Sequence, residues 1–137
     1  MNTSTQASIL LVEDMEEMRN IVQRLLNAMG FRSVTLARHG EEAWRLMQEK
    51  TFDLVLCDWN MPRMSGRELL ERVRQDTRFA TLPFIMLTGE NTSAQVKSAI
   101  AGGVTGFIVK PFTMALLEQR IRACLAASSA PQSEARP

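Results

Sequence analysis

The sequence predicts an α/β domain with a doubly wound, five-stranded parallel sheet and helices on both faces. Short apolar runs alternate with longer amphipathic ones along the chain, which is the pattern of strands that each lead into a helix. The short runs are continuously apolar, as expected of strands that are buried on both faces. Because crossovers between parallel strands are right-handed, only a few topologies fit this pattern.

The predicted strands are short runs of apolar and β-branched residues. Pro83 stands at the first position of its strand, where its missing N–H group is tolerated. The run SVTLA is a weaker strand signal because it is short. The five runs are SILLV (residues 8–12), SVTLA (33–37), FDLVLC (52–57), PFIMLT (83–88) and GFIV (106–109).

The predicted helices carry apolar residues at spacings of three and four. This spacing is clearest over residues 15–29, and Gly30 then supplies a typical stop signal. The segment 92–101 has the weakest amphipathic pattern. The five predicted helices cover residues 15–29, 41–50, 66–75, 92–101 and 113–127.

The favoured order for five such strands is 2-1-3-4-5, which is the flavodoxin-like order. Strands 1 and 3 are then neighbours, and the chain reverses direction between them. Ligands of such domains bind outside the carboxyl ends of the strands at this point. The residues that follow the strands are therefore the candidates for a functional site.

Composition is that of an ordinary soluble domain. The chain has 137 residues, of which 45% are hydrophobic and 23% charged, enough for one domain with a substantial core. Sixteen basic and fifteen acidic side chains leave a net charge of +1, so no overall field attracts nucleic acid or a membrane. Cys57 and Cys124 lie in apolar segments without metal-ligand spacing, and we expect buried thiols in a reducing compartment.

The chain is expected to form one domain with loose ends. We expect a flexible N-terminus over residues 1–7, a folded domain over 8–127 and a disordered tail over 128–137. The polar N-terminus lacks the features of a secretory signal, and no apolar stretch approaches the length of a spanning helix. We therefore expect a cytoplasmic protein.

Polar side chains stand at the carboxyl end of every predicted strand except the second. Glu13 and Asp14 follow the first strand, and Asp58 follows the third. Thr88 ends the fourth strand, and Lys110 follows the fifth. Each residue alone has an ordinary explanation, such as a helix N-cap or a turn. Their coincidence at four strand ends favours a site in which three carboxylates converge.

Converging carboxylates need positive charge nearby. Two unit charges 4 Å apart repel by roughly 4 kcal/mol at an effective dielectric constant near 20. Lys110 can offset one charge, and the remaining oxygen-rich cluster suits a hard divalent cation such as Mg2+ that keeps several waters. Such a cation leaves coordination positions open for a phosphoryl oxygen. The candidate chemistry is phosphoryl transfer to a carboxylate.

Four motifs at the strand ends carry a family resemblance. They are VED after the first strand, CDWNMPRMSG after the third, LTGE at the fourth and FIVKPF at the fifth. In this order and spacing they resemble the receiver domain of two-component response regulators, most closely the stand-alone chemotaxis type. The resemblance covers residues 8–125. It implies a phosphoacceptor signalling protein and not an enzyme, with autophosphorylation and autodephosphorylation as its only activities.

The resemblance implies a role for each acidic residue. Asp58 would be the phosphoacceptor that attacks a phosphohistidine on a sensor histidine kinase, and it would also contact Mg2+. Asp14 would bind Mg2+ directly and Glu13 through water. Asn60 would contribute its backbone carbonyl oxygen, and Lys110 would pair with a phosphoryl oxygen.

The resemblance also implies a switch. Thr88 would hydrogen-bond the phosphoryl group, and Phe107 would swing inward as Thr88 moves. The surface formed by the fourth helix, fifth strand and fifth helix would then change its affinity for a protein partner. The peptide bond before Pro111 is expected to be cis, and Asn60 and Glu90 match the pair that flanks the hydrolytic water, which predicts a short-lived phosphoryl group.

Three departures from the chemotaxis pattern are visible. Glu13 stands where the most similar chemotaxis members carry aspartate, although its longer side chain should still reach a metal-bound water. Phe107 replaces a tyrosine, so a signal that needs the hydroxyl is lost. Gly89 stands where alanine is frequent.

Other functions fit the sequence less well. An aspartyl-phosphate phosphatase of the haloacid dehalogenase type needs a second acid two residues after the nucleophile, where this chain has Asn60. A nucleotide-binding Rossmann protein needs its glycines between a strand and a helix, whereas AGGVTG follows a helix and precedes a strand. A phosphorelay intermediate or phosphate sink that serves a histidine phosphotransfer protein stays open as the alternative role. No output domain follows the predicted helices, so we expect no direct contact with nucleic acid and none with membranes.

Overall fold

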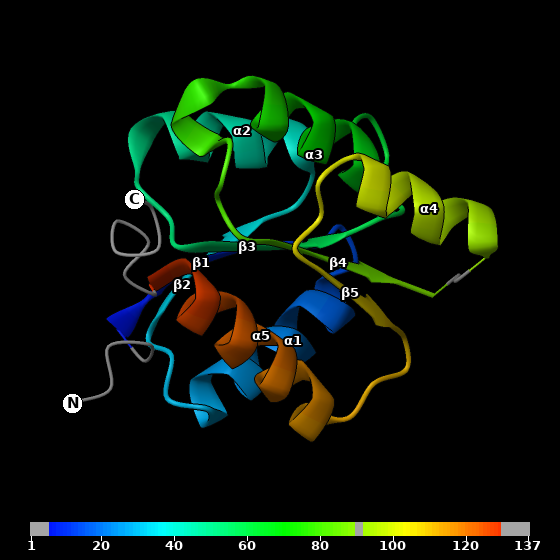
Figure 1. Cartoon of the computed structure of the whole chain (residues 1–137). Coiled ribbons are helices and arrows are strands. Elements are labelled where there is room, and N and C mark those ends of the chain that lie inside the picture. Colours follow the sequence, from blue (N-terminus) through cyan, green and yellow to red (C-terminus); the bar gives the residue numbers. More distant parts are fainter. Residues whose placement is uncertain (1–5, 90–91, 130–137) are drawn as a thin grey trace.

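The computed structural model describes residues 6–89 and 92–129, and in this part of the chain five parallel strands alternate with five α-helices (Figure 1). The strands are β1 (Ser8–Val12), β2 (Ser33–Ala37), β3 (Leu54–Asp58), β4 (Phe84–Thr88) and β5 (Gly106–Val109). The helices are α1 (Glu16–Ala28), α2 (Gly40–Glu49), α3 (Gly66–Gln75), α4 (Ser93–Ala101) and α5 (Met114–Ser129), together with a short 3-10 helix, η2 (Thr77–Phe79).

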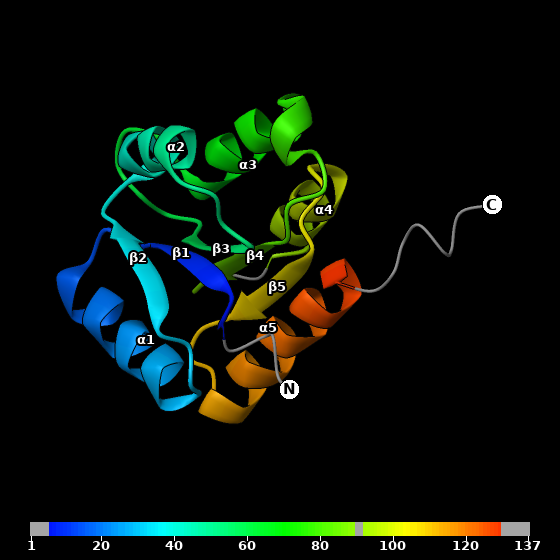
Figure 2. The ribbon, with the colours of Figure 1, turned by 90° about the vertical axis from the view of Figure 1, so that its left-hand side faces the viewer.

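The strand order is β2-β1-β3-β4-β5, so the predicted flavodoxin-like topology is confirmed. The helices α1 and α5 cover one face of the sheet, and α2, α3 and α4 cover the other (Figures 1 and 2). The chain reverses direction between β1 and β3, which are neighbours in the sheet. Both faces of the central strands are therefore covered, as parallel sheets require.

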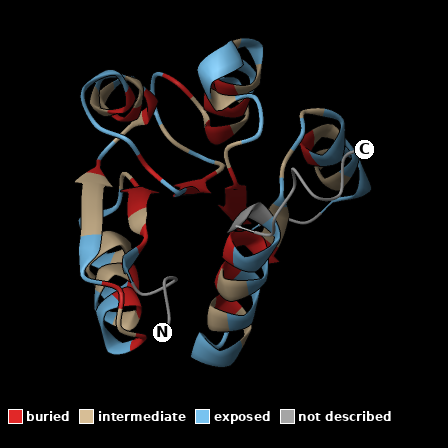
Figure 3. Cartoon of the chain, turned by 60° about the vertical axis from the view of Figure 1, so that its left-hand side comes forward, coloured by how far each residue is buried: buried red, intermediate tan, exposed pale blue. Residues whose placement is uncertain are grey.

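The side chains of each strand alternate between two apolar cores. In β1, Ile9 and Leu11 pack with α1 and α5, whereas Leu10 and Val12 pack with α2 and α3. Every residue of β3 and β4 is buried. Buried residues accordingly line the strands and the inner faces of the helices, while the outer helix faces are exposed (Figure 3). Full burial of one large aliphatic side chain contributes about 1.5–3 kcal/mol, which makes the central strands a stable support.

The register of the sheet aligns the carboxyl ends of the strands. Val12 is paired with Cys57, so Glu13 and Asp58 follow at the same level. On the other side of β3, Asp58 is paired with Leu87, and Thr88 is paired with Val109. The polar residues that end these strands therefore lie along one edge of the sheet.

The ends of several elements differ by one or two residues from the prediction. The third strand is 54–58 instead of 52–57, because Phe52 packs in the core but lies outside the hydrogen-bonded ladder. The fifth helix ends at Ser129, two residues beyond the predicted 127. The 3-10 helix η2 was not predicted, and it begins after Asp76, whose side chain accepts a hydrogen bond from the Arg78 amide. Of the loose ends expected over residues 1–7 and 128–137, residues 1–5 and 130–137 lie outside the described part of the chain.

Within the described residues, no helix combines the length and the apolar character that crossing a membrane would require.

Candidate functional site

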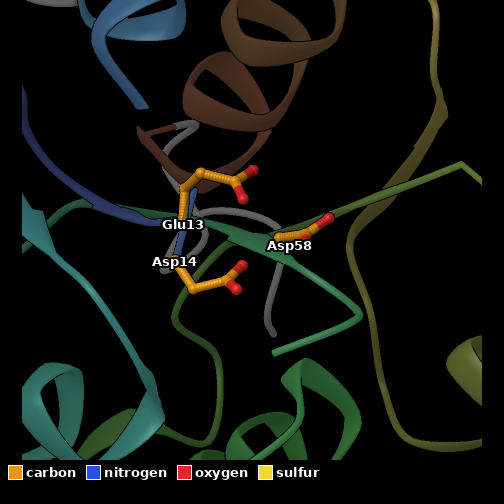
Figure 4. Close-up of side chains that lie close together, drawn as sticks. All are labelled: Glu13, Asp14 and Asp58. Carbon is orange, nitrogen blue, oxygen red and sulfur yellow. The ribbon is translucent and has the colours of Figure 1, made fainter. Parts of the chain in front are cut away.

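Three carboxylates converge at the junction of β1 and β3. Glu13 and Asp14 directly follow β1, and Asp58 is the last residue of β3 (Figure 4). One oxygen of each carboxylate lies within 4.8 Å of the others. The Glu13 amide donates to the Ala37 carbonyl at 3.0 Å, which extends the β1–β2 pairing to the first acidic residue. The convergence that the strand ends predicted is therefore present in the structure.

Lys110 faces this cluster from the end of β5. Its Nζ atom lies 2.8 Å from Asp58 Oδ1 and 3.4 Å from Glu13 Oε1. Its backbone amide donates to the Thr88 carbonyl at 2.7 Å, so the lysine is held to the end of β4. The peptide bond between Lys110 and Pro111 is cis. One ammonium group thus contacts two of three carboxylates.

The cluster is short of positive charge, and the protonation of its acids reflects this. Burial, and after it the charge of Asp58, raises the pKa of Glu13 to about 7, even though Lys110 opposes the rise. Burial also raises the pKa of Asp58, although the hydrogen bond from Lys110 offsets part of the increase. For Lys110, burial lowers the pKa, but the hydrogen bond and charge of Asp58 outweigh it and the net pKa is raised. These shifts have the direction expected of like charges crowded in a buried site.

The donor set fits a divalent cation. Asp14 Oδ1 is buried and has no hydrogen-bond partner in the described part of the chain. Leaving a buried carboxylate oxygen unpaired costs free energy unless a cation or a hydrogen bond satisfies it. All three acidic side chains offer oxygen, which is the ligand that Mg2+ prefers, and their small number leaves positions for water. Glu13, Asp14 and Asp58 are therefore suited to hold Mg2+.

The loop after Asp58 forms one wall of the site. The Trp59 amide donates to the Leu87 carbonyl at 2.8 Å, and the Gly66 amide donates to the Trp59 carbonyl at 2.8 Å. A Cβ atom at Gly66 would collide with the carbonyl oxygen of Asp58, so only glycine lets α3 begin this close to β3. Asn60 lies in this loop and is exposed.

The residues expected to form a switch lie beside the cluster. Thr88 is fully buried at the end of β4. The ring of Phe107, in β5, is half-buried and meets the Trp59 ring edge to face, with centroids 6.4 Å apart. Glu90 lies outside the described residues. Trp59 thus connects the wall of the site to the aromatic residue of β5.

Sequence reasoning did not single out Arg19, which also contacts the acidic corner. Its Nη1 atom donates to the backbone carbonyl of Glu13 at 3.0 Å. Arg19 lies in the first half of α1, six residues after Glu13 along the chain. The short separation in sequence between Arg19 and the acidic residues that follow β1 is a signal that could have suggested this contact. The contact itself depends on how α1 folds back onto the end of β1.

Comparison with known proteins agrees with this geometry. Residues 9–122 match the family model of the response regulator receiver domain. The chain is 41% identical over 118 residues to the chemotaxis protein CheY1 of Helicobacter pylori. The aligned region covers 85% of this chain and 95% of that protein. It is 38% identical over 122 residues to the chemotaxis protein CheY homologue of Campylobacter jejuni, with 88% and 94% covered.

Solved structures show the same similarity. The chemotaxis protein CheY4 of Vibrio cholerae superposes with a TM-score of 0.82 at 33% identity, covering 87% of this chain and 98% of that one. The receiver domain of the sensor histidine kinase PA1611 from Pseudomonas aeruginosa superposes with a TM-score of 0.81 at 26% identity, covering 88% and 98%. The structure of that kinase domain has a magnesium ion coordinated in its active-site cleft.

The doubly wound sheet and its acidic edge define a class of signalling domain that carries a phosphoacceptor and does not act as a conventional enzyme. The chain belongs to the response regulator receiver family of two-component signalling, and within that family it is CheY-like.

The close approach of Gly66 to Asp58 predicts that Gly66→Ala destabilises the protein. The added methyl group must displace either the end of β3 or the start of α3, at an expected cost of about 1–3 kcal/mol. Urea unfolding measures this cost. Gly89→Ala is the matched control, because a Cβ atom there meets no described atom within 4 Å. Equal stabilities for the two variants would contradict the proposed packing.

The raised pKa of Glu13 predicts that the metal-free protein loses stability as the pH rises. The unfolded chain releases this proton near the ordinary value of 4.5, whereas the folded chain holds it up to about 7. The free energy of unfolding should therefore fall between about pH 5 and pH 7. Urea unfolding in EDTA at several pH values measures the slope, and Glu13→Gln should flatten it. An unchanged slope in that variant would show that other groups cause the dependence.

Proposed function

We propose that Asp58 accepts a phosphoryl group from a phosphohistidine of a sensor histidine kinase. Phosphorylation of Asp58 then alters the surface formed by α4, β5 and α5. The observation that carries this proposal is the convergence of three carboxylates and Lys110 on one edge of the sheet, where Asp58 is buried and lies 2.8 Å from the ammonium group. Membership of the receiver family and the 38–41% identity to chemotaxis proteins support it.

Asp58 is placed to act as the nucleophile. It ends a strand in which every residue is buried, and its backbone is fixed by pairing with β4. A carboxylate oxygen of Asp58 forms the new bond to phosphorus while the bond between phosphorus and the donor imidazole nitrogen breaks. The electron pair of the broken bond leaves with the imidazole. Lys110 hydrogen-bonds the carboxylate before the transfer and is within reach of a phosphoryl oxygen after it.

Mg2+ is the cofactor we assign to this site. Asp14 and Asp58 would bind it directly, Glu13 through water, and Asn60 through its backbone carbonyl. When bound, the cation lowers the repulsion between the carboxylates and the incoming phosphoryl oxygens. The free oxygen of Asp14 and the raised pKa of Glu13 support this assignment. The magnesium ion in the related kinase domain supports it as well.

Thr88 and Phe107 form the proposed switch. Thr88 lies next to the end of β3, and its hydroxyl group would donate a hydrogen bond to a phosphoryl oxygen on Asp58. Phe107 lies against Trp59 and would shift as Thr88 moves. Because this chain has phenylalanine at the position, the switch works through burial of the ring and not through a hydroxyl group. Asn60 and Glu90 are the residues expected to set the lifetime of the phosphoryl group, which we propose is short.

The partners follow from this scheme. The donor is a sensor histidine kinase, and the target is a protein that docks on α4, β5 and α5. The receiver itself acts in the cytoplasm without contacting nucleic acid or membrane.

A second candidate role is that of a phosphorelay intermediate or phosphate sink that passes the group to a histidine phosphotransfer protein. Similarity to receiver domains of sensor histidine kinases supports this second role, at 26–27% identity. The higher identity to chemotaxis proteins favours the first role.

Phosphorylation of Asp58 is tested with a small phosphodonor. Incubation with acetyl phosphate and Mg2+ should add one phosphoryl group to the wild type, as measured by intact mass, and none to Asp58→Asn. Asp53→Asn is a matched control, because Asp53 is exposed and precedes the opposite end of β3. An unmodified wild type, or equal labelling of Asp58→Asn, would refute the proposed function.

Binding of Mg2+ is tested through the fluorescence of Trp59. A Trp44→Phe background leaves Trp59 as the fluorophore, since the chain has two tryptophans. Titration with Mg2+ at constant ionic strength should change the emission, and Asp14→Asn should weaken binding by about tenfold or more, because it removes a charged oxygen ligand. Mg2+ should also raise the melting temperature of the wild type. Equal affinity in Asp14→Asn would exclude Asp14 as a ligand.

A further inference from the structure

The helix α4 is weakly held by apolar packing. Of its residues Ser93–Ala101, all of which the structure describes, Ala99 alone is buried. Its neighbour Ile100 is 65% exposed. Apolar burial supplies most of the free energy that holds surface helices in place. Polar contacts must therefore contribute an unusual share of what positions α4.

Two arginines of α3 supply such contacts. Arg67 Nε donates to Ser98 Oγ in α4 at 2.9 Å. Arg74, two turns further along α3, donates from Nε to the Gly103 carbonyl at 2.8 Å and from Nη1 to the Phe79 carbonyl at 3.0 Å. Residues seven apart lie on nearly the same side of a helix, so both side chains extend from α3 toward α4 and the segment that follows it.

Two adjacent glycines make room for these arginines. A Cβ atom at Gly102 would lie 2.9 Å from Arg67 Cζ, and one at Gly103 would lie 3.1 Å from Arg74 Nε. Gly103 also has a φ angle of +90°, which residues other than glycine rarely adopt. The glycines of AGGVTG, whose order does not suit a phosphate-binding turn, therefore have a structural purpose. They let the end of α4 lie against the two guanidinium groups.

Arg74 is also connected to the sheet. Its Nη2 atom lies 3.4 Å from Thr105 Oγ1, which accepts a second hydrogen bond, from the Phe84 amide, at 3.0 Å. Phe84 is the first residue of β4. Arg74 thus joins α3, η2, the segment after α4 and β4, whereas Arg67 makes a single bond to α4. The Arg67–Ser98 bond is the half of this arrangement that is easier to break.

We propose that Arg67 and Arg74 are positioning residues that form a clamp on α4, and that Arg67 links the position of α4 to the phosphoacceptor. Arg67 follows Gly66, the residue that lies against the Asp58 carbonyl. A shift of the Asp58 backbone therefore reaches Ser98 through two adjacent residues of α3. This route is separate from the one through Thr88 and Phe107, and its coupling to phosphorylation rests on the proposed function.

The clamp is tested by amide hydrogen exchange of the unmodified protein. Removing a hydrogen bond to a charged group should speed exchange of the amides of residues 98–104 by about tenfold in Ser98→Ala and in Arg67→Ala. The double variant should exchange no faster than either single variant, because one interaction is lost in all three. Arg72→Ala is the matched control, since Arg72 lies on α3 but stacks on Trp44, 5.5 Å from its ring.

Urea unfolding of the same variants separates local from global effects, since loss of the clamp should speed exchange in this segment more than it lowers overall stability. Exchange at the wild-type rate in both single variants would refute the clamp. Additive effects of Arg67→Ala and Ser98→Ala would refute the direct pairing.

The link to Asp58 is tested by repeating the exchange measurement after phosphorylation with acetyl phosphate and Mg2+. Phosphorylation should change exchange of residues 98–104 in the wild type, and the change should be several-fold smaller in Ser98→Ala. A change of full size in Ser98→Ala would refute the link. A wild type that takes up no phosphoryl group would refute the proposed function. The clamp itself is tested independently, by the exchange measurements on the unmodified protein.

Discussion

The crowding of three carboxylates at one edge of the sheet is the physical feature that sets the chemistry of this protein. Glu13, Asp14 and Asp58 offer oxygens within 4.8 Å of one another, and Lys110 contacts two of these residues. Repulsion of several kcal/mol is expected for charges at such distances. Burial, together with the charge of Asp58, raises the pKa of Glu13 to about 7. The site is thus prepared for a cation and sensitive to any further negative charge.

The crowding is sustained by the rigidity of what lies beneath it. Every residue of β3 is buried, and the register with β1 and β4 fixes the level at which Asp58 stands. Gly66 lets α3 begin directly against Asp58, so the backbone on both sides of the acid is closely packed. Closely packed interiors transmit displacement because they have little free volume to absorb it. A charge added at Asp58 is therefore expected to move neighbouring elements.

The elements best suited to move lie on the side of α4. This helix has one buried residue among those from Ser93 to Ala101, and it is held by hydrogen bonds from α3. Hydrogen bonds have a definite geometry and can be exchanged for others at small net cost, whereas buried apolar surface is costly to expose. A polar attachment thus gives a helix a small set of alternative positions. In our proposal, Thr88 with Phe107 and Gly66 with Arg67 are two routes by which the site selects among them.

The apolar pattern along the chain and the residues that follow each strand were enough to predict the fold class, the strand order and the grouping of Glu13, Asp14, Asp58 and Lys110. The pattern of apolar residues is local, and a parallel sheet always brings the carboxyl ends of its strands to one edge. It could not set element ends to the residue, since the ends of helices and ladders depend on caps and neighbours. Other contacts emerge only from the folded arrangement, namely those of Arg19 with Glu13, of Gly66 with Asp58 and of Arg67 with Ser98. These contacts join residues of different elements, and they depend on how each helix packs on the sheet, which no local periodicity records.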